Sequence, residues 1–257
     1  MARQKNIEEM TTSEAQKEFG NLLERLAYTK SYPDAFSLFL DFALLPFNLE
    51  PTPEEKERFQ KLTDEDKRTL LAMLSCFGII TDNNGEGFKD ALGDLFMEHV
   101  SHGNNGQFFT PEPLCQFMSL ATGVDELKPG QSMCDPTCGS GRMLLAAAKI
   151  AAEKGNRNIW LYGSDLDLTC CKMAALNMLV NSMQGEIAHM NTYYYGSLPK
   201  LAYSQDALQR RSLASIFLPH GGRTNRLYHT VGYFNEAENI SLQTTGNSPP
   251  NVGATTV

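Results

Sequence analysis

The feature that most constrains the fold is a glycine-rich turn at residues 135–141 (DPTCGSG), which lies between a short apolar run and a helix-forming stretch. Gly139 and Gly141 lack a Cβ, so a turn here can bring bare backbone close to a ligand. Residues 132–134 before it predict a short strand, and residues 142–153 after it predict a helix rich in Ala and Leu. A strand, a glycine turn and a helix in this order are typical of a site for a nucleotide-like ligand.

Strand and helix patterns continue to alternate after this helix. Residues 159–163 predict a second strand, which ends close to Asp165. A second helix is predicted over 168–183, and a third strand over 187–189. This alternation predicts an α/β fold with a parallel sheet. Ligands of such sheets bind beyond the carboxyl ends of the strands, which is where Asp135 and Asp165 fall.

The first 100 residues have a helical pattern throughout. Apolar residues over 36–44 recur at three- and four-residue spacing and stop before Pro46. Thr63 with Asp66 is typical of a box-like helix start, and the apolar residues over 88–96 predict another amphipathic helix. We therefore expect a helical module that carries no site chemistry of its own.

The composition limits the classes of function. The chain has 257 residues with 42% hydrophobic content, enough for one α/β domain and a smaller module. Its net charge of −8 argues against a broad basic surface for nucleic acid, because Lys and Arg dominate phosphate binding. Any DNA contact must then be local or supplied by a partner. The apolar runs are too short to cross a bilayer, and the N-terminus lacks the apolar segment of a signal peptide, so we expect no membrane partner.

The cysteines and histidines do not predict a metal site. The six cysteines form no CxxC pair, which favours reduced thiols and a cytoplasmic location. Cys134, Cys138 and the adjacent pair at 170–171 do not have the repeated spacing of a zinc site. His99 and His102 lie three residues apart with no carboxylate at ligand spacing beyond them. We expect no metal.

Asp165 is the strongest single candidate for ligand binding. It follows the glycine turn by about two dozen residues at the end of the next strand, where an acidic side chain accepts hydrogen bonds from ribose hydroxyls. Asp also caps helices, and here Asp167 is the better placed cap. Residues 142–144 (RML) follow Gly141, so the third glycine of the dinucleotide fingerprint is absent. This favours a nucleoside without phosphate over a pyrophosphate, and it disfavours a dehydrogenase.

Four segments together resemble a known family. They are residues 90–96 (DALGDLF), 106–111 (GQFFTP), 135–141 (DPTCGSG) and 163–165 (GSD). In this order they are similar to the modification subunit of type I restriction-modification systems and to related N6-adenine DNA methyltransferases. The resemblance implies a Rossmann-like methyltransferase domain that binds S-adenosylmethionine, preceded by an α-helical domain that helps grip DNA or partner subunits.

The resemblance also implies domain boundaries and site residues. We expect a helical N-terminal domain over 1–103, a cofactor-binding domain over 104–234 with an incomplete match after about residue 195, and a polar tail over 235–257. The implied cofactor-binding residues are Gln107, Phe108, Phe109, Thr110, Pro111, Asp135, Gly139, Ser140, Gly141 and Asp165. The first five would fold over the methionine part of the cofactor. Asp135 would face its amino group or lie just behind it, and Asp165 would accept from the ribose hydroxyls. The two glycines and Ser140 would let the backbone approach the methionine and the ribose. Adjacent residues rarely face the same way, so we expect one of the two phenylalanines to pack in the core instead.

The sequence departs from the family at the catalytic motif. Adenine-N6 methyltransferases carry Asn-Pro-Pro-Phe or a close variant after the fourth strand, where polar groups accept hydrogen bonds from the adenine amino group and the ring stacks on the base. This tetrapeptide occurs nowhere in the chain, and residues 247–251 (NSPPN) lack the aromatic ring. Loss of the stacking ring alone forfeits about 1 to 3 kcal/mol of base binding. No catalytic residue is therefore assigned.

Two functions remain open from the sequence. One is a DNA adenine methyltransferase of a restriction-modification system, with double-stranded DNA as substrate and with specificity and restriction subunits as partners. The other is a catalytically impaired accessory protein that binds the cofactor or DNA. Both share every cofactor residue and differ only in the residues after Asn191. In that region residues 215–220 predict a strand, and we interpret His220 as a strand-end histidine rather than a general base.

Overall fold

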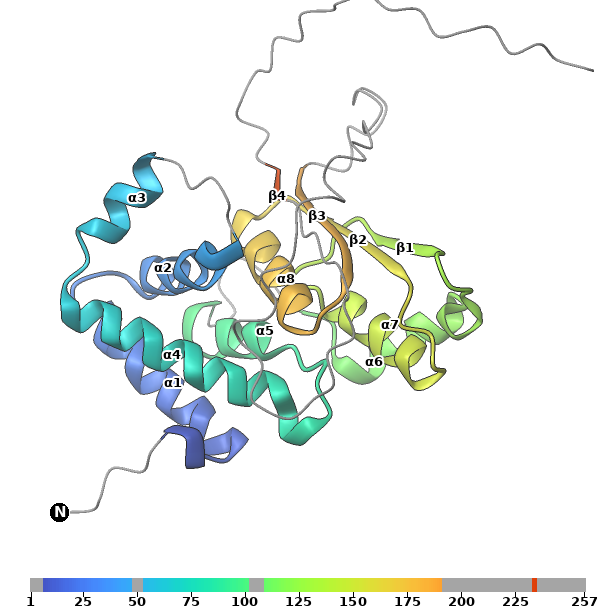
Figure 1. Ribbon diagram of the computed structural model, residues 1–257, viewed down its shortest axis with the longest axis horizontal. Helices are drawn as coiled ribbons and strands as arrows, with labels where there is room; N and C mark the ends of the chain where they lie inside the picture. The colour runs from blue at the N-terminus through green and yellow to red at the C-terminus, as the bar shows by residue number, and fades with distance from the viewer. Residues whose placement is uncertain (1–6, 48–52, 102–108, 191–232, 235–257) are drawn as a thin grey trace, which may run out of the picture.

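The computed structural model of the 257-residue chain describes residues 7–47, 53–101, 109–190 and 233–234. Helices occupy the first part of the chain, and the strands come after them, from residue 132 onward (Figure 1). The α-helices are α1 (Thr12–Ala27), α2 (Tyr32–Leu44), α3 (Pro53–Gln60), α4 (Asp64–Asp82), α5 (Ala91–Phe96), α6 (Glu112–Ala121), α7 (Arg142–Glu153) and α8 (Leu168–Val180). The strands are β1 (Ser132–Asp135), β2 (Trp160–Asp165), β3 (Gln184–His189) and β4 (Tyr233–Phe234). A π-helical turn, Met97–Ser101, continues α5.

Local sequence signals set the ends of several helices. Thr63 and Asp66 form the predicted capping box of α4: the Thr63 hydroxyl accepts from the Asp66 N–H at 3.0 Å, and the Asp66 carboxylate accepts from the Thr63 N–H at 3.3 Å. Helix α2 ends at Leu44, two residues before Pro46, as predicted. Phenylalanines pack edge to face at the centre of the helical region, and the rings of Phe19 and Phe39 are 5.0 Å apart.

The helix predicted over 88–96 begins later than expected, at Ala91. Phe88 adopts a left-handed backbone conformation with φ of 53°, and its N–H donates to the side chain of Asn181 at 2.7 Å. Asp90 instead caps α5 by accepting from the Gly93 N–H at 2.9 Å. The prediction for Phe88 was wrong because this long-range bond to Asn181, which periodicity does not encode, fixes the backbone outside the helix.

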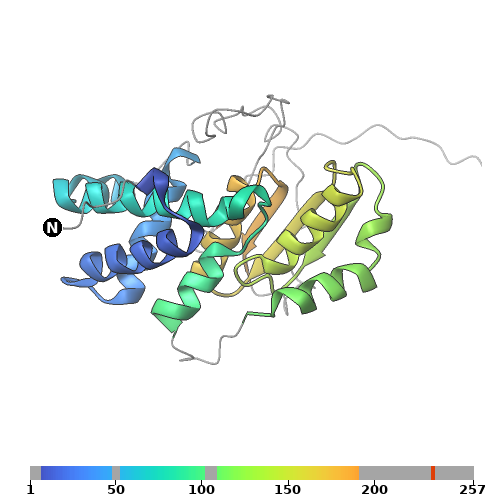
Figure 2. The same cartoon turned by 90° about the horizontal axis from the view of Figure 1, so that it is seen from below.

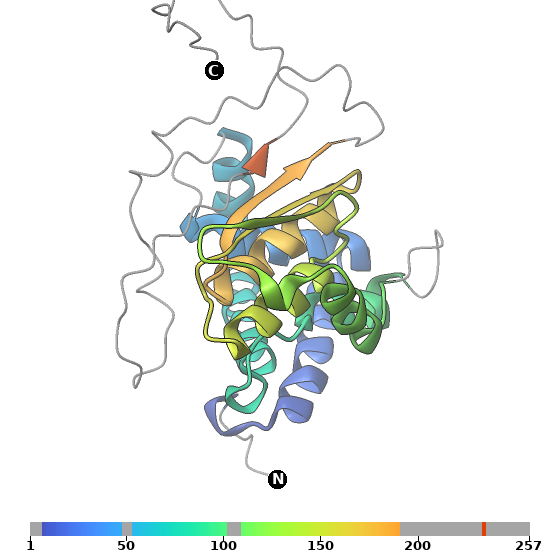
Figure 3. The ribbon, with the colours of Figure 1, turned by 90° about the vertical axis from the view of Figure 1, so that its right-hand side faces the viewer.

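The strands form one parallel sheet in the order β1-β2-β3-β4. Helix α7 connects β1 to β2, helix α8 connects β2 to β3, and both helices cover the same face of the sheet (Figure 2). β4 lies beside β3 at the edge of the sheet (Figure 3). The predicted α/β fold is confirmed. Strand β2 begins one residue later and ends two residues later than the predicted 159–163, and β3 begins three residues before the predicted 187–189. Helix α8 ends at Val180, before the predicted residue 183, because Ser182 has a left-handed backbone with φ of 55°.

Helix α8 is shared by two hydrophobic cores. Cys170, Met173 and Leu176 pack with the helical region, while the opposite side of the helix, including Ala174 and Met178, packs with α7 and the sheet. In Figure 1 helices α1 to α4 lie on one side of α8 and the sheet lies on the other. Among the described helices, none has the length and apolar character needed to cross a bilayer. The boundary predicted near residue 103 falls outside the described residues and stays a prediction.

Candidate ligand-binding site

The glycine turn is attached to the carboxyl end of β2 by three hydrogen bonds. The Cys138 N–H donates to the carbonyl of Ser164 at 2.9 Å, and the Ser164 hydroxyl donates to the carbonyl of Pro136 at 3.2 Å. The Gly139 N–H donates to the carboxylate of Asp165 at 2.8 Å. The turn after the first strand is therefore held in place by the end of the second, as the parallel arrangement predicts.

Asp165 is not the cap of α8. Its second carboxylate oxygen accepts from the Asp167 N–H at 2.9 Å, and Asp167 itself caps α8 by accepting from Thr169 and Cys170. The expectation that Asp167 is the better cap is confirmed. A carboxylate offers about four acceptor positions, so Asp165 keeps the capacity to accept from a ligand hydroxyl. Its ribose-binding role stays a prediction.

A second carboxylate lies at the end of the neighbouring strand. Asp135 ends β1, is half-buried, and accepts from the Thr137 N–H at 3.1 Å. Burial raises the pKa of Asp135, the Thr137 N–H partly opposes that shift, and the nearby charge of Asp165 adds to it. The site edge therefore carries two carboxylates on adjacent parallel strands. Such an edge suits a ligand that presents hydroxyls and positive charge.

Both glycines that were predicted to admit a ligand have left-handed backbones. Gly139 has φ of 54° and Gly141 has φ of 86°, which side chains rarely tolerate. A Cβ on Gly139 would lie 3.0 Å from the ring of Phe109. That ring packs against Phe96, with centroids 6.0 Å apart, and lies 5.9 Å from the guanidinium of Arg142. Phe109 thus packs against the helical core, as expected for one of the two phenylalanines.

The structure describes only part of the segment predicted to fold over the cofactor. Gln107 and Phe108 lie outside the described residues, so their predicted roles remain predictions. Thr110 contributes its carbonyl, which accepts from Arg142 at 3.4 Å, and Pro111 immediately precedes α6 as its cap residue. The strand predicted over 215–220, which ends at His220, and the predicted tail also lie outside the described residues.

The sequence makes no prediction for the side chain of Ser140. This side chain is fully buried, and its hydroxyl donates to the carboxylate of Asp90 at 2.5 Å. Only its backbone can therefore face a ligand. Sequence patterns did not identify Asp90, Arg142 and Asn177, which surround Ser140. Asp90 lay inside a segment that resembled the family, yet no spacing signal connected it to a serine 50 residues later.

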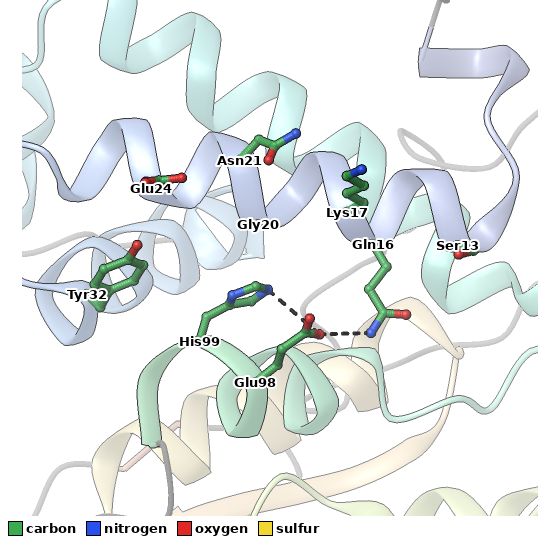
Figure 4. A pocket seen from close by; sticks show the side chains of 9 residues that line it. All are labelled: Ser13, Gln16, Lys17, Gly20, Asn21, Glu24, Tyr32, Glu98 and His99. Atoms are coloured by element: carbon green, nitrogen blue, oxygen red, sulfur yellow. Dashed lines mark hydrogen bonds and ion pairs between the residues drawn. The ribbon is translucent and has the colours of Figure 1, made fainter.

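A separate cleft of about 460 Å³ lies in the helical region, between one side of α1 and the π-helical turn (Figure 4). Glu98 accepts from the side chain of Gln16 at 3.1 Å, and its carboxylate lies 3.8 Å from the ring of His99. Gly20 on α1 leaves room for that ring. None of the lining residues comes from the strands or the glycine turn, so this cleft is not part of the candidate site.

Metal binding finds no support in the described part of the chain, where no group of three or more His, Cys, Asp or Glu side chains is arranged to hold an ion. All six cysteines are free, and only Cys134 is exposed. Burial raises the pKa of the Cys171 thiol to about 12, and the charge of Asp165 contributes to this shift. Thiols in such surroundings stay protonated and inert near neutral pH.

A glycine turn fixed across the ends of two parallel strands, with a carboxylate at each strand end, defines an α/β protein with a Rossmann-like ligand-binding edge. Residues 88–204 match the family described as N-6 DNA Methylase. This match lies over the same part of the chain as the four sequence segments, and the resemblance seen in them is confirmed. The matched range includes α5, the glycine turn, Asp135 and Asp165.

Several curated proteins are similar to the same part of the chain. The methylase subunit of type I restriction enzyme HindI from Haemophilus influenzae is 30% identical over 121 residues, which are 42% of this chain and 26% of that protein. The MjaIX methylase subunit from Methanocaldococcus jannaschii is 25% identical over 137 residues, which are 50% of this chain and 24% of that protein. The chain thus spans about a quarter of the length of these relatives.

Two solved structures have a distant similarity in fold. One, from Listeria monocytogenes, is described as a class I S-adenosylmethionine-dependent methyltransferase and has a TM-score of 0.47 at 19% identity, covering 69% of this chain and 53% of the other. The other is the methyltransferase subunit of a type I restriction-modification system from Streptococcus thermophilus, with a TM-score of 0.42 at 13% identity, covering 76% and 61%. These similarities are too distant to carry an argument about this chain.

Proposed function

We propose that this chain binds S-adenosylmethionine at the carboxyl edge of β1 and β2 and takes part in methylating the N6 amino group of adenine in DNA, within a restriction-modification system. The observation that carries the proposal is the N-6 DNA methylase match, because it covers the segment that builds this edge. In this proposal the cofactor, when bound, supplies the electrophilic methyl group. The protein binds and orients it.

The residues at the edge fit this cofactor chemically. S-adenosylmethionine carries a positive sulfonium and an ammonium group, and its ribose has two hydroxyl donors. Asp135 and Asp165 provide negative charge and free acceptor positions on neighbouring strands. Gly139 and Gly141 leave the backbone of the turn bare, so it can approach the ligand closely. The absence of a third glycine, where the sequence has Leu144, agrees with a ligand that lacks phosphate.

Calorimetric titration with S-adenosylmethionine tests the cofactor part of the proposal. We expect binding by the unmodified chain and at least about tenfold weaker binding by Asp165→Ala, since one good hydrogen bond to a charged group contributes about 1.5 to 3 kcal/mol. Asp167→Ala is the matched control, because it removes a carboxylate two residues away that caps α8. Absence of binding heat with the unmodified chain would refute the cofactor assignment.

Methyl transfer also needs groups that hold the adenine, which accepts the methyl group. In N6-adenine methyltransferases the Asn-Pro-Pro-Phe motif supplies these groups, and this sequence lacks that motif. We therefore propose that the isolated chain transfers methyl groups weakly or not at all, and that specificity and restriction subunits and double-stranded DNA are its partners. The net charge of −8 supports a role for partners in holding DNA, since phosphate contacts need basic side chains. A cytoplasmic location belongs to the same proposal.

A transfer assay with methyl-labelled cofactor tests this second part. The assay compares the chain alone with the chain plus candidate specificity subunits, on DNA that contains or lacks N6-methylated adenine. We expect label in adenine only when a partner is present. Efficient labelling by the chain alone would contradict the proposed dependence on partners, and labelling of cytosine would contradict the adenine assignment.

A further inference from the structure

One buried carboxylate joins the helical region to the glycine turn. Asp90, immediately before α5, accepts from Ser140 Oγ at 2.5 Å and from Arg142 Nε at 2.8 Å. It also accepts from Asn177 Nδ2 at 2.8 Å and from the Gly93 N–H at 2.9 Å. These donors come from the glycine turn, α7, α8 and α5. The side chain of Asp90 thus connects four parts of the protein, and the most distant of its partners, Asn177, lies 87 residues away in the sequence.

Because the four side chains of this network are buried or nearly buried, each polar group needs a hydrogen-bond partner. The side chain of Asp90 is 4% exposed and that of Arg142 is 16% exposed, while Ser140 and Asn177 are fully buried. A buried carboxylate is costly unless its oxygens are paired, and removal of one partner leaves the others unsatisfied. Asn177 also donates to the carbonyl of Ser140 at 2.9 Å. Ser140 is therefore held by two hydrogen bonds, one from its hydroxyl to Asp90 and one from Asn177 to its carbonyl.

The contact between α5 and the turn depends on close approach at Gly93. A Cβ on Gly93 would lie 2.7 Å from Ser140 Oγ and would overlap the carboxylate of Asp90. Real Cβ atoms do not approach other atoms this closely, and both neighbours are buried. The helix can therefore pack on the turn only because this position is glycine.

Arg142 extends the same network to the segment before α6. Its second nitrogen donates to Asp94 at 2.7 Å, and its third donates to the carbonyl of Thr110 at 3.4 Å. Its guanidinium also lies 5.9 Å from the ring of Phe109, the ring that borders Gly139. Asp90 and Asp94 thus orient one arginine that connects the turn to the segment predicted to fold over the cofactor.

We propose that Asp90 is a positioning residue: by fixing Ser140, it holds the turn at residues 136–141 in its binding conformation and couples cofactor affinity to the placement of α5. The proposal rests on the proposed function only for the identity of the ligand. A change that moves α5, such as contact with DNA or a partner subunit, then changes the affinity for the cofactor. The effector and the cofactor are coupled reciprocally, as thermodynamic linkage requires.

The test compares Asp90→Asn with Asp41→Asn. Asparagine keeps the shape of Asp90 but presents an NH₂ group where one oxygen now accepts from Ser140 and Arg142. Asp41 is the matched control, because its carboxylate is 9% exposed, pairs with Arg58 and Lys172 and connects α2 to α3 and α8 without contacting the turn. We expect S-adenosylmethionine to bind about tenfold more weakly to Asp90→Asn and equally well to Asp41→Asn, although both variants melt at lower temperature.

A double-mutant cycle tests whether Asp90 acts through Ser140. Ser140→Ala should weaken binding about tenfold, and the double variant should bind no more weakly than the weaker single variant, because both changes remove the same interaction. Fully additive changes in the binding free energy would overturn the proposal. If Asp90→Asn does not fold, Ser140→Ala alone decides: unchanged affinity together with unchanged amide exchange in the turn would overturn it.

Hydrogen exchange without any cofactor separates this proposal from the proposed function. Peptides that cover residues 136–141 should exchange faster in Asp90→Asn than in Asp41→Asn at equal global stability, adjusted with denaturant. Equal exchange in the two variants would overturn the positioning role. If the unmodified chain does not bind S-adenosylmethionine, the proposed function fails, yet the exchange comparison still decides the role of Asp90.

Discussion

The backbone N–H of Gly139 donates to the carboxylate of Asp165 at 2.8 Å, across 26 residues of sequence. This bond joins the turn after β1 to the end of β2, so the glycine turn and the acidic strand end form one unit. The second oxygen of Asp165 accepts from Asp167, which begins α8. A substitution at Asp165 therefore changes both the turn and the start of the next helix.

Replacement of Asp165 should destabilise the fold as well as the site. Asp165→Ala leaves two part-buried backbone N–H groups without their acceptors, which costs about 1 to 3 kcal/mol in total because water can replace part of each bond. Urea unfolding should show a decrease in this range. Asp167→Ala should cost about 1 kcal/mol through loss of the α8 cap, whereas Asp167→Asn should be nearly neutral because Asn caps equally well. An Asn variant as unstable as the Ala variant would contradict the capping role.

The stability of the protein should depend on the protonation of Asp135. Burial raises the pKa of Asp135 above its ordinary value, so the folded state holds this proton to higher pH than the unfolded chain does. The protonated carboxyl of Asp135 therefore stabilises the folded state at pH values below the ordinary pKa of Asp. This stabilisation is lost as the pH rises through the raised pKa of the folded state. Asp135→Asn, which stays neutral, should therefore unfold at higher urea concentration than the unmodified protein at pH 7.

The advantage of Asp135→Asn should shrink as the pH is lowered to about 4, near the ordinary carboxyl pKa. The substitution keeps a side-chain oxygen that can accept from Thr137, so the local hydrogen bond remains. Unfolding curves at several pH values measure the difference. An advantage that does not change with pH would show that the charge of Asp135 is not its cause.

Two helical glycines should respond in opposite ways to alanine. Gly93→Ala should destabilise by about 2 kcal/mol or more, because the added Cβ would overlap Asp90 and approach Ser140 in a buried contact. Gly78→Ala on α4 should stabilise by up to about 1 kcal/mol, since a Cβ there meets nothing within 4 Å and Ala favours helix. Thermal melting of the two variants measures both effects. A stable Gly93→Ala variant would contradict the close approach of α5 to the turn.

The cysteines should react very unequally with a thiol reagent. Cys134 is exposed on β1 and the other five are buried, so about one of six thiols should react rapidly in the folded protein and all six in denaturant. Partial burial of its sulfur and the charge of Asp135 raise the pKa of Cys134, so its labelling rate should keep increasing with pH beyond the range of an ordinary thiol. Cys134→Ser should abolish the rapid phase. Persistence of that phase would place an exposed thiol elsewhere.

Local features of the protein were determined by the sequence alone. The capping box at Thr63 and Asp66, the bounds of α7 and the cap at Asp167 all depend on interactions within a few residues. The pairing of a glycine turn with an acidic strand end was also predictable, because parallel strands bring their carboxyl ends to one edge. Within the described residues the edge carries the predicted Asp135, Gly139, Gly141 and Asp165.

Only the tertiary structure decided the rest. Phe88 leaves its predicted helix because Asn181 accepts its N–H, and Ser140 turns its side chain to Asp90. Helix α8 serves two cores at once. The first two features depend on contacts between residues 50 or more positions apart, and the third depends on a helix that packs against other elements on both of its sides. Periodicity and capping report interactions along the chain, whereas such contacts form only when packing brings distant segments together.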